Sequence, residues 1–189
     1  MAQNNIEVEI KTKISKKQFA DIKLKLKKIS KPIKEIHHID DYYTPKHKDF
    51  LKPKYPYEWL SVRNRGSKVI LNYKCWYPKG VKNTKYCDEY ETEVSDIDQL
   101  KKIFKVLDIK KIVTVDKKRL SFNYKNKFEI ALDEVKGLGF FIEVEALKNK
   151  RNLNETHKEL VEFAKTLGVE KIIMVPGGYG AEMLRKVKK

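Results

Sequence analysis

The segment Ile6-Glu7-Val8-Glu9-Ile10-Lys11, near the N-terminus, alternates apolar and charged residues and is the clearest indication of the fold. Because successive side chains of a strand point to opposite faces, the three apolar residues share one face. Glu7, Glu9 and Lys11 share the other. The pattern predicts a half-buried strand with a charged face, and similar patterns recur along the chain.

Seven further segments read as strands, and turn residues separate several of them. Gly66-Ser67 indicates a hairpin, and Gly137-Leu138-Gly139 a second tight connection. Pro45, Pro53 and Pro56 mark residues 44–57 as a long loop. The predicted strands cover about residues 33–43, 59–65, 69–73, 86–94, 112–124, 128–135 and 140–146.

Three amphipathic helices and a short terminal helix accompany the strands. Ser15 and Gln18 form a capping box before a helix that runs from about residue 16 to Ser30. Ser95 is expected to cap a second helix, and Asn154 a third that stops near Gly168. Residues 177–184 read as a loop followed by a short helix. We expect one α+β domain over residues 1–189.

The polar faces of the strands are sorted by charge, which an ordinary wet sheet face is not. Charged residues recur at a spacing of two, so the members of each group lie side by side on one face. The acidic set is Glu7, Glu9, Glu89, Glu91, Glu93, Glu143 and Glu145, and the basic set is Arg63, Arg65, Lys117 and Arg119. Since the apolar faces need the helices as cover, the sheet is expected to curl with its charged face inward, as a tunnel.

A tunnel with an acidic half and a basic half requires ions that bridge the halves, because like charges repel strongly away from water. Carboxylates favour Mg²⁺ or Mn²⁺, and these ions also coordinate phosphate oxygens. The basic half favours a polyanion. Only five of the 42 basic residues are Arg, the residue best suited to bidentate phosphate contacts. They are Arg63, Arg65, Arg119, Arg151 and Arg185.

Composition excludes several other classes of protein. With 189 residues, 41% of them hydrophobic, the chain can form an ordinary core, which argues against a disordered tail protein. No apolar run approaches ~20 residues, and the N-terminus lacks a signal-peptide pattern, so a soluble, cytoplasmic protein is expected. Cys75 and Cys87 have no Cys or His at zinc-ligand spacing and are expected to be free thiols on neighbouring strands.

Several segments, in order, resemble the motifs of the CYTH superfamily, the triphosphate tunnel metalloenzymes. This superfamily includes class IV adenylyl cyclases and thiamine triphosphatases. Glu7-Val8-Glu9-Ile10-Lys11 is similar to its Glu-x-Glu-x-Lys signature. The terminal residues 178–184 resemble the Ser-Tyr-x-x-Leu-Leu ending of the cyclase branch, with Gly178 in place of Ser. The other matching segments are residues 60–65, 72–74, 90–94, 115–119 and 132–145.

The resemblance implies an eight-stranded antiparallel β-barrel, the triphosphate tunnel, with a charged interior and helices outside. Glu7, Glu9 and Glu145 would hold a first metal ion, and Asp133 and Glu143 would complete a second site. Glu91 and Glu93 are also expected inside. The implied phosphate-binding residues are Lys11, Arg63, Arg65, Lys74, Lys117 and Arg119, and the implied catalytic residues are Glu7, Glu9, Lys11, Arg119 and Glu145.

Three functions remain open from the sequence. The first in rank is metal-dependent hydrolysis of inorganic triphosphate or of organic triphosphates such as ATP or thiamine triphosphate. The second is an adenylyl cyclase that converts ATP to cyclic AMP and pyrophosphate. The third is a non-catalytic polyanion or RNA binder, suggested by the net charge of +16 and by aromatic residues among the lysines. These are Tyr42, Tyr43, Tyr55, Tyr57 and Trp59.

Two smaller questions accompany these functions. The sequence leaves open whether the protein is a monomer or a homodimer. His37, His38, Asp40 and Asp41 could suggest a zinc site, but adjacent histidines on a strand point to opposite faces, which argues against a local ligand cluster.

Overall fold

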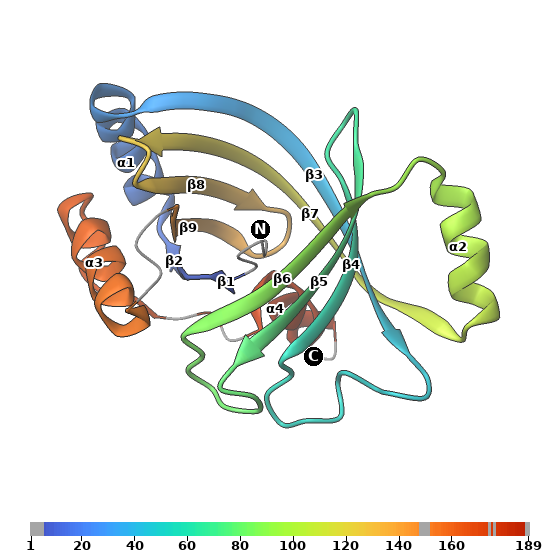
Figure 1. Cartoon of the computed structure of the whole chain (residues 1–189). Helices are drawn as coiled ribbons and strands as arrows, with labels where there is room; N and C mark the ends of the chain where they lie inside the picture. Colours follow the sequence, from blue (N-terminus) through green and yellow to red (C-terminus); the bar gives the residue numbers. More distant parts are fainter. Residues whose placement is uncertain (1–5, 148–151, 174, 176, 188–189) are drawn as a thin grey trace.

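The computed structural model describes residues 6–147, 152–173, 175 and 177–187. Its strands form one antiparallel sheet, curled into a nearly closed barrel (Figure 1). The strands are β1 (Ile6–Glu7), β2 (Glu9–Ile14), β3 (Lys31–Pro45), β4 (Glu58–Asn64), β5 (Val69–Tyr77), β6 (Tyr86–Glu93), β7 (Ile109–Tyr124), β8 (Phe128–Val135) and β9 (Gly139–Ala146). Their order in the sheet is β1-β6-β5-β4-β3-β7-β8-β9-β2. The predicted antiparallel barrel is confirmed.

The barrel closes through residues 6–11. The single strand expected there is divided at Val8: β1 pairs with β6 through Glu7 and Cys87, whereas β2 pairs with β9 through Glu9 and Glu145. The carbonyl of Val8 accepts a hydrogen bond from the amide of Ala146 at 3.0 Å. This division gives nine strands where eight were expected, and it joins the two edges of the sheet.

Most of the helices cover the outside of the barrel. The helices are α1 (Lys16–Ile29), α2 (Ile97–Val106), α3 (Leu153–Thr166) and α4 (Gly178–Val187). α1 and α3 lie on one flank, against β9, while α2 lies on the opposite flank, against β7 (Figure 1). α4 also packs against β7, but from the cavity side: its Tyr179 lines the internal cavity and packs with Val115, Val135 and Phe141. Within the described residues, no helix is both long and apolar enough to cross a membrane.

The caps of the helices confirm one prediction and correct two. The Ser15–Gln18 capping box is present at the start of α1. The cap of α2 is Asp96 rather than Ser95, because the Asp96 carboxylate accepts from the amides of residues 98 and 99. The cap of α3 is Asn152 rather than Asn154, and its side chain accepts from the amide of residue 155. Each error is a choice between neighbouring residues that are all good caps.

The main hydrophobic core lies between the sheet and the helices, on the outer side of the strands. Val8 and Ile10 pack there with Leu26 of α1 and Leu160 of α3. A smaller core under α2 is built around Phe104. The apolar faces therefore point outward beneath the helices, and the charged faces are left to line the inside, as predicted.

The two cysteines behave as the sequence predicts. Cys75 lies on β5 and Cys87 on the adjacent β6, and both are free and buried. Burial raises the pKa of the Cys87 thiol, so this thiol stays protonated near neutral pH.

The start of α4 is fixed by close contacts that give the first testable prediction. Gly177 has φ +74°, and a Cβ atom there would lie 2.8 Å from the Cβ of Ala181 and 2.9 Å from the ring of Trp59. We expect Gly177→Ala to lower the free energy of unfolding in urea by about 1–3 kcal/mol, through strain and overpacking. Gly66→Ala is the control, since Gly66 has φ +78° and no atom within 4 Å of that Cβ. Equal losses in both variants would contradict the packing argument.

Candidate active site

The barrel encloses a cavity of about 230 Å³, lined mainly by charged and polar side chains. All predicted site residues line it except Glu9 and Asp133, which contact the lining residues Lys11 and Arg119. The lining residues are Glu7, Lys11, His38, Asp40, Tyr42, Trp59, Arg63, Arg65, Asn72, Lys74, Trp76, Glu89, Glu91, Lys117, Arg119, Glu143, Glu145, Gly177, Gly178 and Tyr179.

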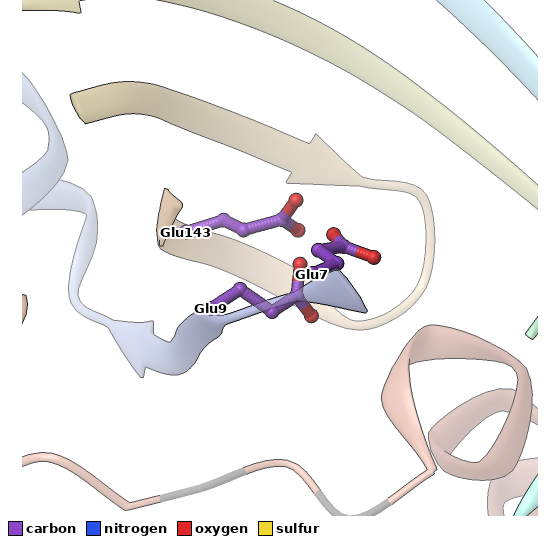
Figure 2. Close-up of side chains that lie close together, drawn as sticks. All are labelled: Glu7, Glu9 and Glu143. Carbon is purple, nitrogen blue, oxygen red and sulfur yellow. The ribbon is translucent and has the colours of Figure 1, made fainter. Parts of the chain in front are cut away.

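Three buried carboxylates meet at the closure of the barrel. Glu7, Glu9 and Glu143 each place a carboxylate oxygen within 4.8 Å of the others, and Figure 2 shows them converging from β1, β2 and β9. Glu145 lines the same cavity and is the register partner of Glu9. The sequence grouped Glu145 with Glu7 and Glu9, whereas the structure places Glu143 in this cluster.

Two observations show that the cluster suits a divalent cation. The Oε2 atom of Glu9 is buried and meets no hydrogen-bond donor among the described residues. Burial raises the pKa of Glu7, and the neighbouring Glu9, Glu89 and Glu145 raise it further, against the effect of Lys74. Carboxylates that are crowded, buried and incompletely paired are hard oxygen ligands of the kind that Mg²⁺ and Mn²⁺ prefer.

Two lysines contact the carboxylate cluster and compensate part of its charge. The Nζ atom of Lys11 lies 2.8 Å from Glu9 and 3.0 Å from Glu143. Lys74 lies 2.5 Å from Glu7 and 3.3 Å from Glu89. Burial would lower the pKa of Lys11, but Glu143 and Glu9 outweigh it, so this lysine remains charged. A polyanion that enters the cavity can therefore share these cations with the carboxylates.

Arg119 joins the basic wall to the acidic cluster. Its guanidinium donates to both oxygens of Asp133, at 2.8 and 2.6 Å, and to Glu143 at 2.9 Å. The hydroxyl of Tyr179, from α4, donates to Asp133 at 2.8 Å. Asp133 has no exposed surface, and in this arrangement it orients Arg119. A metal ion on Asp133 would have to replace these contacts.

Two further arginines, Arg63 and Arg65, are held at the cavity by carboxylates. Arg63 donates to Glu89 at 3.2 Å and to Glu91 at 2.9 Å, and Arg65 forms an ion pair with Asp40. Glu91 thus lies at the cavity, as expected, and its contact orients Arg63. Glu93 does not, because it is 57% exposed and pairs with Lys68 outside the cavity lining.

Three residues of β3 that were not among the predicted site residues also line the cavity. His38, Asp40 and Tyr42 alternate along the strand and all face the cavity. The spacing of two that identified the Glu-x-Glu pairs was present here as well. His37 points the other way and bonds to Asp116 at 2.6 Å, which confirms that the adjacent histidines face opposite sides. Two of the five arginines in the chain were not predicted as site residues. Arg185 pairs with Glu182 on α4, and Arg151 lies outside the described residues.

Lys117 gives a pH-dependent prediction. Burial and Arg119 lower its pKa to about 8, although Asp133 and Asp40 act in the opposite direction. The side chain of Lys117 is therefore mostly charged below pH 8 and mostly neutral above it. We expect the affinity for inorganic triphosphate to fall as the pH rises from 7 to 9, as measured by calorimetry. Lys117→Arg should remove most of this fall, because Arg stays charged. The same fall in both proteins would assign it to another group.

A nearly closed antiparallel barrel whose carboxylates and cations surround an internal cavity has the architecture of a tunnel, and its lining suits small anions and divalent cations. The chain belongs to the CYTH family: the CYTH domain model matches residues 5–179. Enzymes of this family generally act on triphosphates and depend on metal ions. The site residues predicted from the sequence line this cavity or contact residues that line it.

Three relatives illustrate the similarity. A Methanocaldococcus jannaschii protein described as a candidate adenylate cyclase is 33% identical over 178 residues, which cover 92% of this chain and 96% of that protein. The solved structure of protein PH1819 from Pyrococcus horikoshii has a TM-score of 0.77 at 29% identity and covers 97% of this chain and 99% of its own. A Hippeastrum cyclase homologue described as having a dominant triphosphatase activity has a TM-score of 0.65 at 16% identity, covering 96% and 95%, and shares the fold alone.

Proposed function

We propose that this protein is a divalent-metal-dependent triphosphatase that hydrolyses inorganic or organic triphosphates. The observation that carries the proposal is one cavity with two chemically different walls. Glu7, Glu9 and Glu143 form the first, and Lys117 and Arg119 belong to the second. A metal-bound triphosphate satisfies both walls, since the metal binds the carboxylates and the phosphate oxygens bind the cations.

In hydrolysis, the residues of the cavity would have two different roles, to hold the metal ion and to hold the phosphates. Mg²⁺ or Mn²⁺ held by Glu7, Glu9 and Glu143 would stabilise charge on the phosphate oxygens and make a bound water more acidic. Glu145 and the predicted pair of Asp133 and Glu143 are candidates for further metal contacts. Arg119 and Lys117 would hold the phosphates for attack by water on the terminal phosphorus. An O–P bond forms there, the bridging P–O bond breaks, and a diphosphate leaves.

Adenylyl cyclase activity is the second candidate, favoured by the name of the Methanocaldococcus relative. The size of the cavity ranks it lower. Pockets for drug-sized ligands measure roughly 300–1,000 Å³, and this cavity measures about 230 Å³. It suits a triphosphate better than a triphosphate together with its ribose and adenine, which a cyclase must hold in one fixed geometry.

Simple polyanion or RNA binding is the third candidate and has the least support. Three of the five aromatic residues that suggested it do not form an open stacking surface. Tyr42 and Trp59 line the cavity and pack edge to face, and Tyr43 is buried against Phe104. A binder would also have no use for the crowded carboxylates, which repel the same ligand.

Phosphorus NMR separates the three candidates. The protein is incubated with inorganic triphosphate or ATP, with Mg²⁺ or Mn²⁺, and with EDTA as the control. We expect metal-dependent release of orthophosphate. Cyclic AMP and pyrophosphate from ATP would instead establish the cyclase, and binding of both compounds without turnover would favour the binder.

A further inference from the structure

His38 is the buried group of the cavity that the proposed chemistry leaves without a role. It lies on β3, is 5% exposed and lines the cavity. Neither ring nitrogen meets a hydrogen-bond partner among the described residues. Buried polar groups are almost always hydrogen-bonded, because leaving one unpaired costs free energy. A histidine kept only for packing would have a backbone or side-chain partner at this depth.

The surroundings of His38 indicate which ligand it meets. Lys117 is its register partner on β7, and Arg65 and Arg119 also lie close enough to affect its titration. Burial and these three cations lower the pKa of His38 to about 3, although Asp40, which pairs with Arg65, acts in the opposite direction. The imidazole is therefore neutral near pH 7, with one N–H donor and one acceptor nitrogen.

A cation is an unsuitable ligand for this position. The three cations that surround His38 would repel a metal ion, and the cluster of Glu7, Glu9 and Glu143 is the part of the cavity that attracts one. An anion, in contrast, gains from all three cations and can accept the N–H of the ring. The unpaired donor and the local charge thus favour the same kind of ligand.

We propose that His38 binds the triphosphate directly and donates its ring N–H to a phosphate oxygen that the surrounding cations also hold. This inference rests on the proposed triphosphate substrate. It adds a neutral donor to a set of phosphate contacts that the sequence predicted to consist of Lys and Arg only.

Two substitutions test the contact. His38→Phe keeps a flat ring but removes both nitrogens, and His38→Gln keeps an amide donor at comparable reach. Binding of inorganic triphosphate is measured by calorimetry in EDTA, where metal chemistry is absent. We expect His38→Phe to weaken binding by about 10-fold to 100-fold, as for a hydrogen bond to a charged group, and His38→Gln by less than about 5-fold.

A second readout separates ligand binding from a structural role. Because the ring nitrogens meet no partner among the described residues, His38→Phe should leave the melting temperature unchanged or raise it. A structural histidine would give a lower melting temperature instead. The proposal therefore predicts that His38→Phe binds triphosphate more weakly without a lower melting temperature. Binding equal to that of the wild type would overturn it.

Nitrogen NMR of the wild-type protein provides a test that requires no variant. The ring nitrogens of His38, assigned by comparison with His38→Gln, should report a neutral ring and shift when inorganic triphosphate is added in EDTA. No shift at saturation would refute the contact. Loss of turnover does not enter these experiments, so the proposed hydrolysis and the role of His38 can fail separately.

Discussion

Replacing Arg119 with methionine should lower the free energy of unfolding by about 3–5 kcal/mol. The guanidinium is the charged partner of Asp133, which has no exposed surface, and it also compensates Glu143. Its removal leaves two carboxylates in a buried site that already contains Glu7 and Glu9. Urea unfolding followed by circular dichroism measures the loss. Affinity for inorganic triphosphate should fall as well, because the same group is expected to bind phosphate.

Two further variants show whether the effect belongs to the buried pair. Arg185→Met removes an exposed arginine that pairs with Glu182 on α4, and it should cost less than about 1 kcal/mol. Asp133→Asn added to Arg119→Met should recover part of the stability, because the uncompensated charge is then gone. A double variant no more stable than Arg119→Met would argue that the loss comes from packing.

The second large effect is expected for Glu9→Gln. This change keeps the shape of the side chain and an acceptor for Lys11. It removes the charge of a buried carboxylate whose Oε2 atom meets no donor in the part of the chain that the structure describes. We expect metal-dependent turnover of inorganic triphosphate to fall by at least about 100-fold, since metal catalysis contributes several kcal/mol. Calorimetry should show weaker binding of Mn²⁺.

Glu93→Gln is the matched control, because Glu93 is exposed and pairs with Lys68 outside the cavity lining. It should bind Mn²⁺ and turn over substrate like the wild type. If Glu9→Gln retained full Mn²⁺ affinity, the carboxylate cluster would not be the metal site. If it lost Mn²⁺ but kept turnover, the proposed metal dependence would be wrong.

Much of the fold was predictable because the strands carry a strict alternation of charge. In the first segment, the side chains of Val8 and Ile10 had to point to one face of the sheet, and those of Glu7 and Glu9 to the other. Charged groups are stable inside a barrel only when they are paired, and Lys11 with Glu9 and Arg119 with Asp133 are such pairs, the first within one strand and the second between adjacent strands. The sequence also predicted that the charged face points inward, because the amphipathic helices were available to cover the apolar face on the outside.

The remaining features depend on three-dimensional placement that alternation does not specify. The register between β2 and β9 places Lys11 opposite Glu143, and the approach of Glu143 to Glu7 and Glu9 depends on that pairing. Tyr179 comes from a terminal helix, and nothing in its local sequence indicates a contact with Asp133. The sequence argued against a metal cluster at His37 and His38 because adjacent histidines on a strand face opposite sides, but that His38 lacks hydrogen-bond partners among the described residues is visible only in the folded protein.

The division of the first strand at Val8 also affects when the site can exist during synthesis of the chain. Glu7 and Glu9 are synthesised before their partners, because β1 must wait for β6, and β2 must wait for β9, which ends at Ala146. Pairing between such distant segments is slow to form. The carboxylates that meet at the closure are therefore apart in the growing chain until residue 146 has been translated, so a nascent chain should acquire its affinity for Mn²⁺ only after that point and in a single step.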